Sequence, residues 1–121
     1  MLQTILIIED DESSMKLFND LLCAHNYRTI MFNGQGCSLS LIRKHQPDLI
    51  LMDVKLPGRT GIERVKVLKA EGDVENIPVI ALTAHAMKGD GVKFMEAGFN
   101  GYITKPINIH SFLETVATHL K

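Results

Sequence analysis

The sequence lacks the features that mark secreted, membrane or nucleic-acid-binding proteins. Its 121 residues include no tryptophan and two cysteines, Cys23 and Cys37, whose spacing matches no metal or redox motif. The formal net charge is −1 and the lysines and arginines are scattered, so no surface for nucleic acid is indicated. No signal peptide opens the chain, and its first apolar run is too short to span a membrane. We therefore expect one cytoplasmic domain with reduced cysteines.

Short apolar runs, rich in β-branched residues, alternate with segments of helical periodicity along the whole chain. The runs predict strands at residues 4–8, 27–31, 48–52, 79–82 and 102–103. The periodic segments predict helices at 12–24, 36–45, about 61–71, about 86–97 and from Asn108 onward. Uninterrupted apolar runs are typical of strands buried on both faces, which favours a parallel sheet. The expected fold is thus α/β, a doubly wound five-stranded parallel sheet of flavodoxin-like order 2-1-3-4-5 with five helices.

Apolar residues at helical spacing indicate which helix faces should pack on the sheet. In the first helix these residues are Met15, Leu17, Phe18, Leu21 and Leu22. In the last helix they are Ile109, Leu113, Val116 and Leu120. The cysteines are expected to be buried, and so are the methionines Met15, Met31, Met52, Met87 and Met95.

Capping and breaking residues predict several helix boundaries. Either Asp10 or Asp11 could cap the first helix. Gly98 has the position of a C-terminal stop for the fourth helix. Gly89 and Gly91 both fall inside that helix, where each glycine costs about 1 kcal/mol relative to alanine. The fourth helix is therefore expected to be weak.

Carboxylates follow two of the predicted central strands. Glu9 and Asp10 come directly after the run 4–8, and Asp53 ends the run 49–52. These strands are neighbours in the predicted order, so Glu9, Asp10 and Asp53 should meet in one crevice at the carboxyl edge of the sheet. Crowded carboxylates repel one another unless a cation neutralises them. Mg²⁺ suits a site with few carboxylates, because it keeps water ligands and binds phosphate oxygens.

Polar residues also end the other central strands, since Thr83 closes the fourth run and Lys105 follows the fifth. The complete set, in this order and spacing, resembles the response-regulator receiver domain of two-component signalling. The matching stretches cover essentially the whole chain and are Ile7-Ile8-Glu9-Asp10, Asp48-Leu49-Ile50-Leu51-Met52-Asp53, Leu56-Pro57, Gly61, Ala81-Leu82-Thr83-Ala84 and Gly101-Tyr102-Ile103-Thr104-Lys105-Pro106. Three further stretches, 15–18, 86–90 and 112–115, resemble the single-domain cell-division regulators of the DivK type.

The resemblance implies a Mg²⁺-dependent phosphorylation site. Asp53 would accept a phosphoryl group from a histidine kinase. Asp10 and Asp53 would bind Mg²⁺ directly, and Glu9 would bind it through water. The backbone carbonyl of Lys55 would complete the protein ligands. Mn²⁺ is the expected substitute for Mg²⁺.

The same resemblance implies further roles around the phosphoacceptor. Thr83 and Lys105 would bind phosphoryl oxygens, and Thr83 with Tyr102 would form the conformational switch. The Lys105–Pro106 peptide bond is expected to be cis. Physical reasoning supports the cationic groups independently, because a carboxylate is a poor nucleophile toward an anionic phosphoryl group unless cations screen the charge.

The implied function is that of a single-domain response regulator. Residues 1–121 would form the receiver, without an output domain, and phosphorylation would change the binding of an effector protein. Such a protein would act in cell-cycle or cell-division control, or as a phosphorelay intermediate. Its partners would be a sensor histidine kinase or phosphotransfer protein and the effector, with no nucleic acid and no membrane insertion. It would not be an enzyme beyond accepting its own phosphoryl group and slowly losing it.

Other interpretations of these residues are open at this point. Asp10 could be only a helix N-cap, and Lys105 could be a surface lysine in a weak ion pair. A receiver fold that is never phosphorylated would be a constitutive binding module, which labelling by a phosphodonor would distinguish. A phosphohydrolase of the haloacid-dehalogenase kind would need an aspartate where Lys55 stands. A flavin carrier would need a phosphate-binding loop at the acidic residues 9–12, which would repel phosphate.

Overall fold

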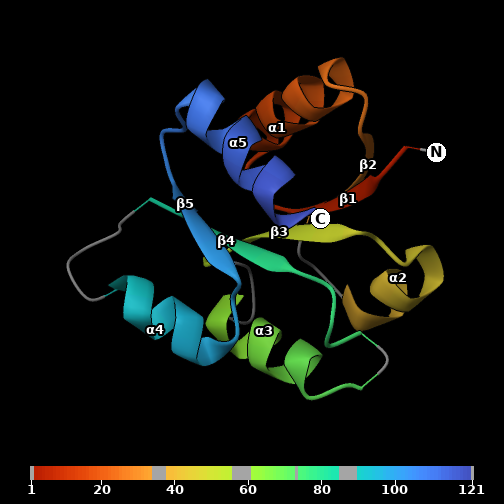
Figure 1. The fold of residues 1–121 in the computed structure, drawn as a ribbon, viewed down its shortest axis with the longest axis vertical. Coiled ribbons are helices and arrows are strands. Elements are labelled where there is room, and N and C mark those ends of the chain that lie inside the picture. The colour runs from red at the N-terminus through yellow and green to blue at the C-terminus, as the bar shows by residue number, and fades with distance from the viewer. Residues whose placement is uncertain (1, 34–37, 56–60, 73, 85–89, 121) are drawn as a thin grey trace.

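The computed structural model describes residues 2–33, 38–55, 61–72, 74–84 and 90–120. Strands and helices alternate along these ranges, as Figure 1 shows. Their bounds are β1 Thr4–Ile8, α1 Glu12–Ala24, β2 Arg28–Phe32, α2 Ser38–His45, β3 Leu49–Asp53, α3 Gly61–Lys69, β4 Val79–Thr83, α4 Asp90–Ala97, β5 Gly101–Thr104 and α5 Ile109–His119.

The strands form one parallel sheet in the order β2-β1-β3-β4-β5. β1 lies between β2 and β3, with Ile7 opposite both Met31 and Leu51. Nearly every residue of β1, β3 and β4 is buried, because helices cover both faces of the sheet. The predicted α/β class, the doubly wound sheet and the strand order are therefore confirmed.

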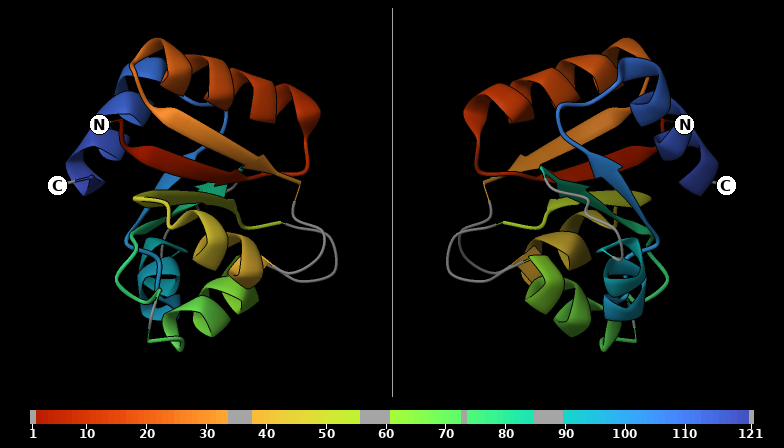
Figure 2. Two further views of the ribbon diagram at one scale, coloured as in Figure 1. Left: turned by 90° about the vertical axis from the view of Figure 1, so that its right-hand side faces the viewer. Right: turned by 90° about the vertical axis from the view of Figure 1, so that its left-hand side faces the viewer.

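Two layers of helices enclose the sheet (Figure 2). α1 and α5 lie on one face, and α2, α3 and α4 lie on the other. Beneath α1 and α5, Phe18 stacks on Phe112 with ring centroids 5.4 Å apart. Beneath α4, Phe94 meets Phe99 edge to face at 6.0 Å. Such rings bury large apolar areas, so each face of the sheet has its own packed core.

Capping side chains fix the starts of two helices. Asp11 is the N-cap of α1, and its carboxylate accepts a hydrogen bond from the backbone N–H of Ser14 at 2.9 Å. Asn108 caps α5 in the same way, accepting from the N–H of Ser111 at 3.0 Å. Asp11 is thus the residue that caps α1, which leaves the side chain of Asp10 available for another role.

α4 ends at Gly98 in a Schellman motif, as the sequence predicts. Gly98 has a φ of +121°, and its N–H donates to the carbonyl of Met95 at 3.2 Å. The N–H of Phe99 donates to the carbonyl of Phe94 at 3.1 Å, and the two rings pack together. This stop sets where the chain turns from α4 into β5, whose end carries the residues of the candidate site.

Two apolar residues predicted to face the core are exposed instead. Leu17 on α1 and Ile109 on α5 both point to solvent. The predictions were wrong because only a narrow stripe of each amphipathic helix contacts the sheet. On α5 that stripe is centred on Phe112 and Val116, which are fully buried.

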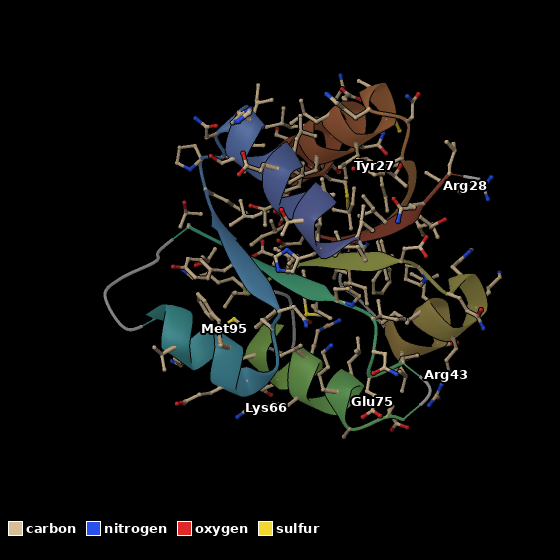
Figure 3. The ribbon with its side chains drawn as sticks, viewed as in Figure 1. Tyr27, Arg28, Arg43, Lys66, Glu75 and Met95 are labelled. Atoms are coloured by element: carbon tan, nitrogen blue, oxygen red, sulfur yellow. The ribbon has the colours of Figure 1, made fainter. Side chains whose placement is uncertain are left out.

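The methionine and cysteine predictions hold only in part. Met52 on β3 is fully buried, as expected. Met31 lies on the edge strand β2 and is 56% exposed, and Met95 on the outer side of α4 is exposed as well (Figure 3). Cys23 is also exposed, against expectation, because it lies on the α1 surface near the edge strand. Cys37 lies outside the described residues.

The predicted element bounds differ from the observed ones by one or two residues. β2 begins at Arg28 rather than at residue 27, and α3 ends at Lys69 rather than near residue 71. The predicted starts of the second and fourth helices, with Met87 and Gly89, lie outside the described residues. Among the described residues, no helix has the length and apolar character needed to cross a bilayer.

Candidate functional site

The carboxyl edge of the sheet brings together the polar residues that end its central strands. Glu9 follows β1 directly, Asp53 is the last residue of β3, and Thr83 is the last residue of β4. All three are buried although they are polar. β3 lies between β1 and β4, so Asp53 occupies the middle of this edge. Buried polar groups are costly unless they are paired, so this edge is where a functional site is expected.

Lys105 supplies the positive charge of this site. Its Nζ donates to Oδ2 of Asp53 at 3.0 Å and to Oε1 of Glu9 at 2.5 Å. Its backbone N–H donates to the carbonyl of Thr83 at 2.7 Å, which ties the end of β5 to the end of β4. The Lys105–Pro106 peptide bond is cis. One ammonium therefore pairs with two buried carboxylates that come from different strands.

Glu9, Asp10 and Asp53 form a group of carboxylates that could hold a metal ion. A ligand oxygen of each lies within 4.8 Å of the others. Glu9 and Asp53 are buried, whereas Asp10 is exposed, so the group opens to water on one side. Hard oxygen ligands with room for water suit Mg²⁺. These residues therefore fit the metal that the sequence suggests.

Backbone N–H groups orient the carboxylates of this group. The N–H of Asp10 donates to Oε2 of Glu9 at 3.1 Å. The N–H of Lys55 donates to Oδ1 of Asp53 at 3.0 Å. Because Oδ2 of Asp53 already faces Lys105, both of its oxygens are held in a defined direction. The Lys55 side chain is exposed.

Electrostatics shows that the carboxylates carry more negative charge than Lys105 balances. Burial, aided by the nearby Asp53, raises the pKa of Glu9 from 4.5 to about 7, although Lys105 opposes the rise. For Lys105, burial lowers the pKa, but the hydrogen bonds to Glu9 and Asp53 outweigh it, and the net direction is upward. Lys105 therefore stays charged, while Glu9 holds a proton more readily than an ordinary glutamate. A divalent cation would relieve this excess negative charge.

A cavity of about 400 Å³ opens above Asp53 between the sheet edge, α3 and α4. Its lining includes Lys93 and Phe94 of α4, which sequence reasoning did not assign to the site. Helical periodicity could have placed Phe94 toward the sheet, but nothing in the sequence signals that Lys93 faces the same cavity. His85, two residues after Thr83, lies outside the described residues.

Tyr102 is not one of the residues that line this cavity. It is 44% exposed on β5, and its ring packs against Phe94 with ring centroids 5.8 Å apart. Tyr102 and Thr83 share one face of the sheet, because Tyr102 pairs with Ala81 and Thr83 pairs with Thr104. The structure thus brings Glu9, Asp10, Asp53, Thr83 and Lys105 together. It places Tyr102 on β5, with its ring against Phe94 of α4.

Comparison with known proteins identifies the family to which this geometry belongs. Residues 5–117 match the response regulator receiver domain. The chain therefore belongs to the response-regulator receiver family, and it is a signalling protein, as its sequence predicts.

Individual members of this family show how similar the chain is to known proteins. The polar-differentiation response regulator DivK of Brucella ovis is 46% identical over 120 residues, covering 99% of this chain and 98% of that protein. A CheY-like receiver domain protein from Methanospirillum hungatei is 29% identical, with a TM-score of 0.86 over 99% of this chain and 94% of that one. The receiver domain of a Pseudomonas aeruginosa sensor histidine kinase is 27% identical, with a TM-score of 0.85 over 99% of this chain and 98% of that one. That structure has a magnesium ion coordinated in its active-site cleft.

Proposed function

We propose that Asp53 accepts a phosphoryl group from a phosphohistidine of a sensor kinase or phosphotransfer protein. The observation that carries this proposal is the pairing of Asp53 with the Lys105 ammonium beside two further carboxylates. An oxygen of Asp53 would form a bond to phosphorus while the phosphorus–nitrogen bond of the phosphohistidine breaks and its electron pair returns to the imidazole. The reaction needs a carboxylate nucleophile that is ionised, oriented and close to positive charge.

The carboxylate group would hold Mg²⁺ during this reaction. Asp10 and Asp53 would be direct ligands, Glu9 would act through water, and the carbonyl of Lys55 would complete the protein contribution. When bound, the metal would neutralise charge on the phosphoryl oxygens as they approach the carboxylates. Support comes from the carboxylate spacing and from the magnesium-bound receiver of Pseudomonas aeruginosa. We propose that Mn²⁺ can substitute, since it also prefers oxygen ligands.

Lys105 and Thr83 would respond to the new group. The Lys105 ammonium lies 3.0 Å from Asp53 Oδ2, so it could bind a phosphoryl oxygen attached to that carboxylate after a small movement. Thr83 ends the neighbouring strand β4, and its hydroxyl could donate to another phosphoryl oxygen. Contacts that exist only in the phosphorylated state are the ones that shift a conformational equilibrium. Together with Tyr102, Thr83 would carry that shift to the protein surface.

The output would be a change in protein binding at the surface of α4, β5 and α5. Exposed apolar side chains on this surface include Val92, Met95 and Tyr102. The 46% identity with DivK of Brucella ovis supports a role in cell division or cell polarity. We propose that the protein acts in the cytoplasm, without enzymatic turnover of a separate substrate, and that its phosphoryl group is lost slowly by hydrolysis.

Acetyl phosphate labelling followed by intact mass measurement tests this function. Wild type should gain the mass of one phosphoryl group with Mg²⁺ or Mn²⁺ and none with a chelator. Asp53→Asn should gain none, whereas Asp20→Asn, a control at an exposed carboxylate of α1, should behave like wild type. Labelling of Asp53→Asn, or labelling of wild type that is unchanged by the chelator, would disprove the assignment of Asp53 as the metal-dependent phosphoacceptor. A protein that no phosphodonor labels would instead be the constitutive binding module.

A further inference from the structure

The ring of Tyr102 lies directly over the first turn of α4. A Cβ atom placed on Gly91 would come within 3.0 Å of Cε1 and 3.2 Å of the hydroxyl oxygen of Tyr102. Such distances are tighter than nine in ten real Cβ contacts, so a side chain at residue 91 would require the ring to shift by a few tenths of an ångström. Gly91 and Phe94 together form the surface on which the ring lies.

The backbone at Gly91 does not itself require glycine. The described residues with positive φ are Asn26, Gln46 and Gly98, and Gly91 is not among them. It lies within the helical residues of α4, where glycine is disfavoured relative to alanine. A methyl group at this position would therefore meet no backbone strain, and the obstacle to it is the ring of Tyr102. Glycine here weakens the helix but provides space for the tyrosine.

The ring of Tyr102 has a second neighbour within its reach. Tyr102 pairs with Ala81 across β4 and β5, and Thr83 lies two residues further along β4 on the same face. Diagonal neighbours at this spacing are within reach of an aromatic side chain. A rotation of the half-exposed Tyr102 side chain could therefore exchange contact with Gly91 for contact with Thr83.

We propose that Gly91 is a positioning residue that keeps the ring of Tyr102 over α4 and away from Thr83. By lacking a side chain it sets the balance between two ring positions, one on α4 and one beside Thr83. Replacing it with alanine moves the ring toward Thr83 without phosphorylation. The consequence for signalling rests on the proposed function, in which Thr83 engages the phosphoryl group on Asp53.

A double-mutant cycle tests whether the ring alone opposes a side chain at position 91. Replacing glycine by alanine where the backbone allows it typically raises the folding equilibrium constant by about two- to fivefold. Gly91→Ala should show this gain when Tyr102 is alanine, and a clearly smaller gain or a loss when Tyr102 is present. Gly72→Ala is the matched control, because nothing lies within 4 Å of a Cβ placed there. Equal gains for Gly91→Ala in both backgrounds would overturn the proposal.

The position of the ring can be observed directly. The chain has two tyrosines and no tryptophan, so Tyr27→Phe leaves Tyr102 as the only tyrosine for isotope-labelled NMR. In this background the ring should show nuclear Overhauser contacts with residue 91. Gly91→Ala should weaken the contacts with α4 and strengthen those with the Thr83 methyl group. Ring contacts that do not change in Gly91→Ala would overturn the proposal.

A further background separates this proposal from the proposed function. The same NMR comparison in Asp53→Asn involves no phosphoryl group, so the ring shift should persist there. If the ring shift persists but acetyl phosphate never labels Asp53, the positioning role stands and the phosphorylation role fails. If Asp53 is labelled normally but the ring does not move in Gly91→Ala, the positioning role fails alone.

Discussion

Glu9 should govern how the stability of the metal-free protein depends on pH. Its side chain is only 1% exposed, and it accepts a hydrogen bond from Lys105. Burial, together with the neighbouring Asp53, raises its pKa from 4.5 to about 7. The informative change is Glu9→Gln, which nearly preserves the shape of the side chain and removes its ionisation.

The sign of the effect follows from proton binding in the two states. In the unfolded chain Glu9 ionises near pH 4.5, whereas in the folded protein it keeps its proton until about pH 7. Between these values the folded state binds more protons, so the free energy of unfolding falls as the pH rises. Each pH unit in this window removes about 1.4 kcal/mol, so the whole window removes about 3 kcal/mol. Glu9→Gln should lack this loss.

Urea unfolding in the presence of a chelator, from about pH 4.5 to about pH 8, measures the difference between the two proteins. The free energy of unfolding of Glu9→Gln should increase relative to wild type by about 3 kcal/mol across this range. The free energy of unfolding of Glu96→Gln, at an exposed glutamate of α4, should change with pH as that of wild type does. Saturating Mg²⁺ should stabilise wild type most at the alkaline end, because it favours the ionised carboxylates. A difference between Glu9→Gln and wild type that is constant with pH would refute the reasoning.

Three other substitutions have expected outcomes. Lys105→Ala should destabilise the metal-free protein by about 3 kcal/mol near pH 8, because two buried carboxylates lose their ammonium. Urea unfolding measures this change, and a loss of stability below about 1 kcal/mol would contradict the prediction. Lys105→Ala should still be labelled by acetyl phosphate, but calorimetry should show no gain in partner affinity on phosphorylation. Lys55→Asn should lose its phosphoryl group up to about fivefold faster at saturating Mg²⁺, since an ion pair of the exposed Lys55 ammonium with a phosphoryl oxygen would contribute up to about 1 kcal/mol. An equal or slower rate of phosphoryl loss would discard this prediction. Lys69→Met should lower the free energy of unfolding by about 2 kcal/mol, because the Lys69 ammonium donates to three oxygens. Lys66→Met, at an exposed lysine of the same helix, should change it little.

The sheet and its acidic edge could be predicted because both depend on short stretches of sequence. Continuous apolar runs such as Leu49 to Met52 are compatible with few structures other than a strand buried on both faces. Once the strand order is assigned, the residues that end neighbouring strands must meet. The positions of Glu9, Asp53 and Thr83 follow from this rule without any knowledge of side-chain contacts.

The features that could not be predicted depend on how elements pack against one another. Spacing identified an apolar face on α5 but not the rotation that buries Phe112 and exposes Ile109. Gly91 could be recognised as a weakness of the fourth helix, but its role as a space for Tyr102 depends on the distance between α4 and β5. The hydrogen bond of Lys105 with Glu9 also joins residues that are 96 positions apart in the chain. Propensity and periodicity describe single elements, so contacts of this kind lie beyond them.

Two partly buried lysines, one at each edge of the sheet, show why the carboxyl edge carries the chemistry. At the amino edge, Lys69 donates to the carbonyls of Glu75 and Ile77 and to the side-chain oxygen of Asn100, all neutral acceptors. Burial lowers the pKa of Lys69, with the charge of Glu75 opposing in part, and the oxygens that accept these three hydrogen bonds carry no charge to exchange. Lys105 has anionic partners, and its pKa is raised despite burial. An ammonium held by carboxylates can exchange one anionic oxygen for a phosphoryl oxygen without losing charge pairing. The same residue type is thus a structural clamp at one edge and a group suited to a switch at the other.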